Sequence, residues 1–369
     1  MTKGKLILII IILVAIFSTI LYINYDNIVN FVDNKEWEVA DSIAKIIPNK
    51  YLQLSCAGDE LIIIESDQVS TYTYSEVPIY TVQTALREVV SDSESSYSII
   101  GEVSSGKLVL LNEKGKLWDF NVNGEILTVS VNKNGYVACI YSKSGYKSLI
   151  KVIKPTGEEM FTNYLASTYA VDVEISNDNK YLALAEVNTE GITLESSVKI
   201  IDMNKAVDET IKTVKLDNNT LLLDVEYTDK NELLMLEDNR IEKLSDDYQR
   251  QLIREYRQGE VSHITIENGN NGILVEKVDT GIFSTEYLVK IYSDYNEWKE
   301  YKLNGTPKQI YAQEKLVAVD MGNEILFLNT NGRLVKRCEL NGQVKEICLY
   351  RNGGMAALVF RDRIEIVKL

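Results

Sequence analysis

The chain has 369 residues, 45% of them hydrophobic and 25% charged, and its 39 Lys and Arg against 54 Asp and Glu give a formal net charge of −15. This acidic balance repels phosphate backbones and argues against a nucleic-acid-binding protein. A single histidine excludes a multi-histidine metal centre, and four cysteines are too few for a disulfide scaffold. The sequence suggests no cofactor, and it leaves the oligomeric state open.

The first 24 residues have the pattern of a membrane anchor. Lys3 and Lys5 precede an uncharged apolar stretch over residues 6–23, which as a helix would rise about 27 Å, close to the hydrocarbon thickness of a bilayer. A cleaved signal peptide is the alternative, but this stretch lacks the small residues of an A-x-A-like cleavage site. The two lysines place the N-terminus in the cytoplasm, since positive flanks stay inside.

These signals predict a cytoplasmic N-terminus over residues 1–5, a single-pass signal anchor over 6–24, a linker over 25–34 and an extracytoplasmic domain over 35–369. Without Lys3 and Lys5, the remaining 37 basic and 54 acidic groups give the exported part a charge of −17.

Beyond the anchor the sequence predicts many short β-strands, and residues 40–47 come nearest to a short helix. A similar apolar strand returns at intervals of 36 to 52 residues, 42 on average, which matches the ~40–45 residues of a four-stranded propeller blade. In chain order these strands are residues 61–64, 97–100, 136–139, 181–184, 233–236, 273–275, 316–319 and 355–358.

Three families of turns surround this strand in a fixed order. Turns rich in Asn, Asp and Gly precede it at residues 132–135, 176–180 and 351–354, and such residues tolerate positive φ. Glycine turns follow two strands later at residues 113–116, 155–158 and 330–333. Asn-Gly turns at residues 122–125, 303–306 and 340–343 then lead into the next repeat.

The repeats predict an all-β propeller of eight four-stranded blades, with seven blades as the alternative if one repeat is degenerate. The chain ends in two strands, residues 355–360 and 363–368, which make an incomplete blade. We expect residues 37–39 to supply its outer strand and residues 51–54 to begin the first blade. Such an exchange would tie both ends of the chain together.

Two segments resemble known propellers. Residues 173–183, VEISNDNKYLA, resemble the inner strand, turn and second strand of WD-repeat-like and quinoprotein-like propellers. Residues 107–118, KLVLLNEKGKLW, resemble their third strand, turn and fourth strand. With its N-terminal anchor, the chain resembles a family of membrane-anchored bacterial β-propellers of unknown function. The resemblance covers residues 35–369 and implies an architecture rather than an activity.

Longer turns between the second and third strands predict a binding surface. In a propeller these turns share one face with the connections between blades, so Tyr146, Ile192 and Phe283 are candidates for one apolar rim that binds a protein partner. The alternative, which we favour slightly, is that these tips pack on neighbouring blades.

The inner strands carry a second pattern. Asp172-Val173-Glu174 and Asp224-Val225-Glu226 share one register in adjacent repeats, and His263 and Glu346 fall at the position of Asp172. Carboxylates and the sole histidine beside a central channel would suit cation binding or acid/base chemistry. The alternative, which we prefer, is a solvated polar lining. The candidate channel group is Asp172, Glu174, Asp224, Glu226 and His263.

The cysteines form no C-x-x-C pair. Cys56 and Cys348 map to inner strands of neighbouring blades, so a bond between them is one hypothesis. We favour the interpretation that all four are buried small apolar residues.

Taken together, the sequence favours a non-enzymatic protein-binding or scaffolding module at the cell envelope, whose partner is another envelope protein. The alternative is an envelope enzyme or a ligand or cation sensor acting through the channel group. Recognition of wall polysaccharide by the many tyrosines is a third hypothesis, for which the sequence locates no patch.

Overall fold

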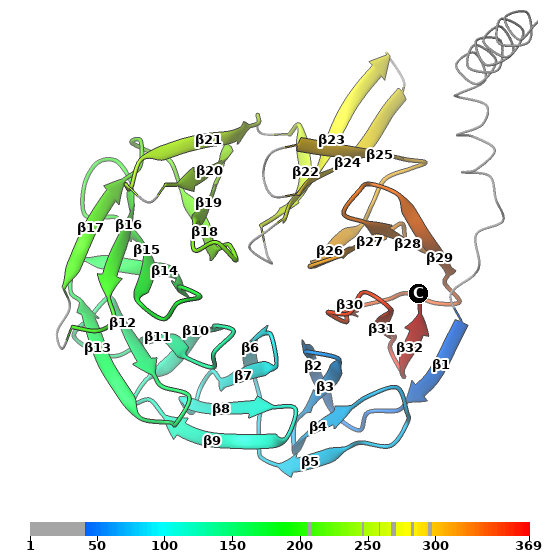
Figure 1. The fold of residues 1–369 in the computed structure, drawn as a ribbon, viewed down its shortest axis with the longest axis horizontal. Coiled ribbons are helices and arrows are strands. Elements are labelled where there is room, and N and C mark those ends of the chain that lie inside the picture. Colours follow the sequence, from blue (N-terminus) through cyan, green and yellow to red (C-terminus); the bar gives the residue numbers. More distant parts are fainter. Residues whose placement is uncertain are drawn as a thin grey trace, which may run out of the picture.

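The computed structural model describes residues 41–205, 209–245, 247–257, 259–266, 271–281, 284–293 and 297–369. Within these residues, 32 strands form eight four-stranded antiparallel sheets, arranged as blades around a central channel (Figure 1). The prediction of an eight-bladed propeller is therefore confirmed. The predicted anchor, residues 6–24, lies outside the described residues. In the part that is described, no helix is long and apolar enough to span a bilayer.

The first four blades follow the chain, each from its innermost strand outward. Blade 1 is β2 (Tyr51–Ala57), β3 (Glu60–Glu65), β4 (Gln68–Tyr72) and β5 (Tyr80–Gln83). Blade 2 is β6 (Val89–Glu94), β7 (Tyr97–Glu102), β8 (Lys107–Asn112) and β9 (Gly115–Asn121). Blade 3 is β10 (Glu125–Val131), β11 (Val137–Ser142), β12 (Ser148–Ile153) and β13 (Glu159–Leu165). Blade 4 is β14 (Thr168–Ile175), β15 (Tyr181–Asn188), β16 (Glu195–Asp202) and β17 (Thr210–Lys215).

The remaining blades continue this order until the last one. Blade 5 is β18 (Leu222–Tyr227), β19 (Leu233–Glu237), β20 (Arg240–Leu244) and β21 (Arg250–Glu255). Blade 6 is β22 (Val261–Thr265), β23 (Asn271–Gly281), β24 (Ser284–Ser293) and β25 (Glu297–Leu303). Blade 7 is β26 (Gln309–Gln313), β27 (Leu316–Asp320), β28 (Glu324–Asn329) and β29 (Leu334–Glu339). Blade 8 is β30 (Glu346–Leu349), β31 (Met355–Val359), β32 (Ile364–Lys368) and β1 (Asp41–Ile46).

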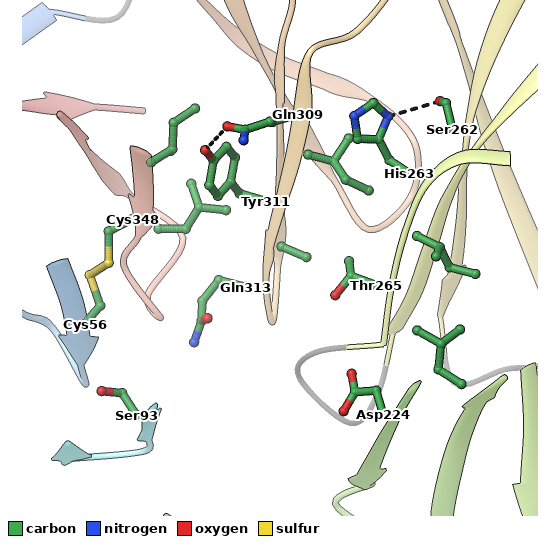
Figure 2. A pocket seen from close by; sticks show the side chains of 16 residues that line it. Cys56, Ser93, Asp224, Ser262, His263, Thr265, Gln309, Tyr311, Gln313 and Cys348 are labelled. Atoms are coloured by element: carbon green, nitrogen blue, oxygen red, sulfur yellow. Dashed lines mark hydrogen bonds between the residues drawn. A yellow bond between two sulfur atoms is a disulfide. The ribbon is translucent and has the colours of Figure 1, made fainter. Parts of the chain in front are cut away.

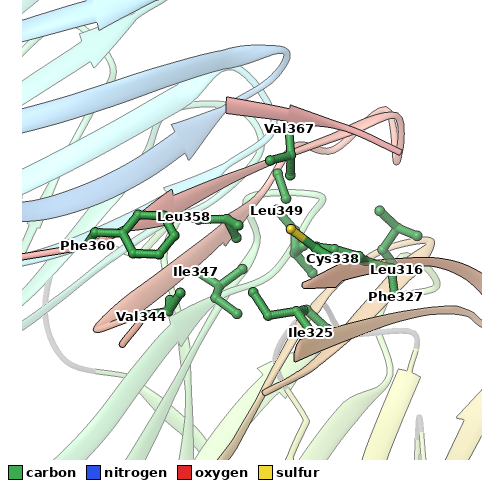
Figure 3. Packing of buried hydrophobic residues seen from close by; sticks show 12 residues of the cluster. Leu316, Ile325, Phe327, Cys338, Val344, Ile347, Leu349, Leu358, Phe360 and Val367 are labelled. Carbon is green, nitrogen blue, oxygen red and sulfur yellow. The ribbon is translucent and has the colours of Figure 1, made fainter. Parts of the chain in front are cut away.

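The recurring apolar strand of the sequence is the second strand of every blade. This strand lies between two hydrogen-bonded neighbours and two adjacent blades, so it is buried on both faces and needs no polar alternation. Among the described residues, eight apolar clusters lie one at each interface between neighbouring blades. Figure 3 shows the cluster between blades 7 and 8, where Phe327 and Ile325 face Leu358 and Ile347.

The last blade closes the ring by strand exchange. β1 pairs antiparallel with β32, from Asp41 opposite Lys368 to Ile46 opposite Ile364, and Figure 1 shows the first and last described strands in one blade. The exchange was predicted, but the closing strand is residues 41–46 instead of 37–39, which lie outside the described residues. Of the segment predicted nearest to a helix, residues 41–46 form a strand instead: Ala44 and Ile46 are buried while Lys45 is exposed, the alternation of a strand.

The predicted turn chemistry is present. Gly135, Asn179 and Gly353, each in a turn between the first and second strands, have φ of 79°, 59° and 73°. At Gly135 a Cβ would lie 2.7 Å from the ring of Tyr97, so both the backbone and the neighbour require glycine there.

The propeller has two faces that differ in what they carry. We call upper the face with the turns between second and third strands, the connections between blades and the start of each inner strand. The lower face carries the turns between first and second strands and between third and fourth strands. β1 begins on the lower face, because Asp41 pairs with Lys368 at the lower end of β32.

A disulfide joins the first and last blades. The Cys56 and Cys348 sulfur atoms are bonded, across a Cα–Cα distance of 6.6 Å and 292 residues of sequence. The favoured interpretation of these two cysteines was therefore wrong, because the inner strands β2 and β30 approach closely at the seam of the ring. Cys139 and Cys338 are buried and unbonded, as that interpretation held.

A candidate interaction surface at the channel mouth

In the described part of the chain, five inner strands contain a β-bulge near their upper ends. In each, the pairing with the second strand skips one residue, between Tyr51 and Gln53 in blade 1 and at the matching places of blades 3 to 6. A bulge leaves one residue unpaired and re-aims its side chain. The bulged residues are Leu52, Leu127, Val171, Leu223 and Ser262.

The bulges of blades 3, 4 and 5 present aliphatic side chains to solvent. Leu127 and Leu223 are each 47% exposed and Val171 is 37% exposed. Without the bulges, the regular alternation of a strand would not direct these three side chains to solvent. Burying one such side chain in a complex would release water from apolar surface, which favours association.

Further exposed apolar side chains lie on the same face of these three blades. Of the sixteen large hydrophobic residues exposed in the described chain, eight belong to the upper side of blades 3 to 5. We call these eight the apolar arc: Leu127, Tyr146, Tyr164, Tyr169, Val171, Ile192, Leu221 and Leu223. A concentration of this kind on one face is typical of an interaction site.

Two of the three predicted rim residues belong to the arc. Tyr146 and Ile192 lie in upper turns of adjacent blades, and Ile192 is fully exposed. Tyr146 contacts the ring of Tyr164 at 5.1 Å between centroids, within its own blade. Lys147 lies 4.9 Å from the ring centre of Tyr169 on the next blade. The third, Phe283, lies outside the described residues.

Below the arc, Asp172 and Asp224 face each other across the interface of blades 4 and 5. Each directly follows a bulged residue, and their carboxyl groups share a hydrogen bond. Asp172 also accepts a hydrogen bond from the backbone N–H of Val225 at 3.0 Å. Burial, and then the neighbouring Asp224, raise the pKa of Asp172 well above its usual range, so the pair tends to hold one proton.

Glu174 and Glu226 lie deeper, with two acidic residues from blade 2. They line a cavity of about 240 Å³ with Asp92 and Glu94. Burial raises the pKa of Glu174 and of Glu226 well above the ordinary value, and the neighbouring carboxylates add to this effect. The Ser130 hydroxyl donates to Glu174 at 2.6 Å, linking blades 3 and 4.

Arg351 closes the lower side of this acidic region. It lies in the turn between β30 and β31 and forms ion pairs with Glu94 at 2.8 Å and Glu314 at 2.5 Å. The guanidinium thus connects blades 8, 2 and 7 near the lower face. Burial is the largest effect on Glu94, and together with the neighbouring acidic Glu314 it raises the pKa of Glu94 although Arg351 lowers it.

His263 lies in another wall of the channel, away from the acidic groups of blade 2. Its Nε2 donates to the backbone carbonyl of Lys308 at 2.8 Å, which links blades 6 and 7, and its Nδ1 lies 3.0 Å from the Ser262 hydroxyl. Both ring nitrogens are therefore engaged. In the described chain, no three His, Cys, Asp or Glu side chains are placed to hold a metal ion.

His263 and Asp224 nevertheless border one cavity of about 670 Å³. Figure 2 shows Asp224 facing it from blade 5 and Tyr311 and Gln313 from blade 7, with the Cys56–Cys348 bond in its far wall. The channel is thus asymmetric: the acidic residues of blades 2, 4 and 5 face a side with amides, hydroxyls and the imidazole, on which the carboxyl group of Glu346 is bonded to Tyr51 and Leu54.

The predicted channel residues also hold the blades together. Asp172 bonds the inner strand of the next blade, His263 bonds Lys308 just before the next inner strand, and Glu346 accepts from the backbone N–H of Leu54 at 3.3 Å. The predicted common position of these three residues therefore corresponds to a common structural role. In blade 2, Asp92 accepts from the N–H of Val131 at 2.7 Å.

Sequence reasoning missed Asp92 and Glu94, although they repeat the D-x-E spacing of Asp172 and Glu174. It also missed the bulges. Their signal is a pair of adjacent apolar residues, Ile126-Leu127 or Leu222-Leu223, where an inner strand should alternate.

Comparison with known proteins adds a family to this geometry. A family model described as "Family of unknown function (DUF5711)" matches residues 28–369. The chain belongs to this family. A comparison of the DUF5711 sequence with curated proteins finds no match.

Solved structures similar to this DUF5711 protein share its fold at low identity. The C-terminal WD40 domain of Sif2 has a TM-score of 0.66 at 12% identity, covering 90% of this chain and 99% of that domain. Sqt1 from Chaetomium thermophilum has a TM-score of 0.58 at 10% identity, covering 90% and 100% of the two chains. The dihydro-heme d1 dehydrogenase NirN has a TM-score of 0.55 at 12% identity, covering 87% and 76%. The scaffold is WD40-like, and because its relatives in fold include an enzyme, the fold alone assigns no activity.

Proposed function

We propose that this protein is a membrane-anchored, extracytoplasmic β-propeller that binds another envelope protein through its apolar arc and has no catalytic role. The observation that carries the proposal is the arc itself: half of the exposed large hydrophobic residues of the described chain lie on one face of three consecutive blades. Three of them are held outward by bulges. Apolar and aromatic side chains at the centre of a rigid surface are the usual anchors of protein interfaces.

Two observations support the location. The sequence of residues 6–23 has the length and apolar character of a signal anchor. The disulfide between Cys56 and Cys348 suits an oxidising compartment, because cytosolic thiols are kept reduced.

The channel group is the weaker basis for a function. Asp172 and His263 form hydrogen bonds between blades, so their positions are explained without a catalytic role. An acid or base in catalysis needs a group that reaches a substrate.

The proposal is tested by photo-crosslinking in cells. A photoreactive amino acid at Leu223 or Ile192 should crosslink one defined membrane or envelope protein. Combined substitution of Val171, Leu223 and Ile192 by Ser should reduce recovery of that protein at least tenfold, because the apolar contact is removed.

The matched control uses the lower face. Val77 and Ile79 are 71% and 50% exposed in the lower turn of blade 1, and Val77→Ser with Ile79→Ser should leave capture unchanged. A melting temperature close to that of the wild type shows that each variant is folded. Equal capture by the arc variant and the wild type would overturn the proposal.

A further inference from the structure

We propose that the partner bound by the apolar arc presents a lysine or arginine flanked by aliphatic residues, and that this cationic group enters the channel mouth beside Asp172 and Asp224. The inference rests on the proposed function and adds the chemistry of the partner segment.

The bulges place the two kinds of contact next to each other. Val171 precedes Asp172 and Leu223 precedes Asp224, and in each pair the first residue is the bulged, solvent-facing one. The second residue turns inward and lies at the channel side of the interface between blades 4 and 5. An aliphatic group on the arc is therefore one residue away from a carboxyl group.

Charge determines which side chain suits the mouth. The inner strands of blades 2, 4 and 5 bring six acidic residues to the channel: Asp92, Glu94, Asp172, Glu174, Asp224 and Glu226. Arg351, which forms ion pairs with Glu94 and Glu314, lies near the lower face and not at the upper mouth. At the upper end, Asp172 and Asp224 bond to each other and to a backbone N–H.

The surroundings of the arc carry charges of both signs. Glu125, Glu190 and Asp238 lie at the upper ends of blades 3 to 5 together with Lys143, Lys147 and Lys215, and Asp217 there is paired with Arg240 at 3.3 Å. The acidic channel residues therefore set the sign at the mouth, where a peptide with acidic side chains or an anionic lipid surface would meet like charge. A basic group between aliphatic ones meets complementary charge and complementary apolar surface at once.

The test is a selection of peptides. Phage displaying random 12-residue peptides are selected on the full-length protein in nanodiscs of uncharged phosphatidylcholine and counter-selected on the Val171→Ser/Leu223→Ser variant. Peptides that depend on the arc should carry Lys or Arg within three residues of Leu, Ile, Val or Phe. In a synthetic representative, changing that basic residue to Gln should weaken binding at least tenfold.

The carboxyl pair is tested in the protein. Asp172→Asn with Asp224→Asn should weaken the same peptide at least tenfold, whereas Asp119→Asn, which removes one negative charge from the outermost strand of blade 2, should not. Arc-dependent peptides that lack a basic residue, or that tolerate the Asp172/Asp224 variant, would overturn this inference and leave the proposed function standing. If selection yields no arc-dependent peptide and crosslinking no arc-dependent partner, both fail.

Discussion

The side chain of Asp172 joins two blades, but its burial beside a second carboxyl group disfavours its charged form. Its carboxyl group accepts a backbone N–H of blade 5 and faces Asp224. Burial and the neighbouring carboxyl group raise its pKa, so the folded state holds a proton that the unfolded state releases above about pH 4. The contribution of this carboxyl group to the free energy of unfolding is therefore fully present at low pH and is lost as the pH rises towards the pKa of the folded state.

We accordingly predict that Asp172→Asn stabilises the protein at pH 7.5, and stabilises it less at pH 5, because asparagine keeps the hydrogen bonds without the charge. Chemical denaturation at the two pH values measures this. Asp119→Asn is the control: Lys116 lowers the pKa of Asp119 on an outer strand, so no gain is expected. A loss of stability at pH 7.5 for the Asp172 variant would contradict the assignment.

The closing strand β1 determines how the ring closes. In β1, Ala44 and Ile46 pack into the cluster between blades 8 and 1, while Ile43 is 43% exposed. We predict that Ile46→Ala costs about 2–4 kcal/mol of unfolding free energy, through lost burial and a cavity at the closing strand. Ile43→Ala, the same change at the exposed bulge residue of β1, should cost about 0.5 kcal/mol or less. Urea denaturation measures the unfolding free energy of both variants. Equal losses of unfolding free energy would rule out closure of the ring by β1.

The elements also show how far the sequence could lead. The second strands and the turns around them were predictable, because burial on both faces and positive-φ turns leave strong patterns in residues such as those of 181–184 and Gly135. The closing strand was misplaced, because both 37–39 and 41–46 precede the first blade and local pattern does not select between them. The position of Asp172 beside Asp224 was predictable from their shared register. The bulges at Val171 and Leu223 were not, since unpaired residues depend on the partner strand.

At the scale of the whole molecule, the ring closes both by strand pairing and by a covalent bond. The sequence predicted that Cys56 and Cys348 lie on the inner strands of neighbouring blades. It could not predict their bond, because the Cα–Cα distance of 6.6 Å is set only by the closed ring. The bond joins residues 292 apart in sequence, so it restricts the unfolded chain strongly.

We predict that a reductant lowers the unfolding free energy of the wild type by roughly 2–5 kcal/mol and leaves that of Cys56→Ser/Cys348→Ser unaffected. Cys139→Ala/Cys338→Ala should keep the sensitivity to reductant, because these cysteines are unbonded. Alkylation of intact cells before lysis tests the compartment: an exported domain should show Cys56 and Cys348 protected from the reagent until reduced. Full alkylation without reduction would contradict an oxidising location.

The position of β1 has a mechanical consequence. A chain anchored ahead of Asp41 enters the propeller at the lower face, whereas the apolar arc lies on the upper face. Tension between a membrane and a partner held at the arc would then run along β1 and load its pairs with β32 together, in shear. Pairs loaded together resist more force than pairs opened one after another. The Cys56–Cys348 bond lies on the inner strands, away from that line of force, so the ring would remain closed even after β1 had slipped.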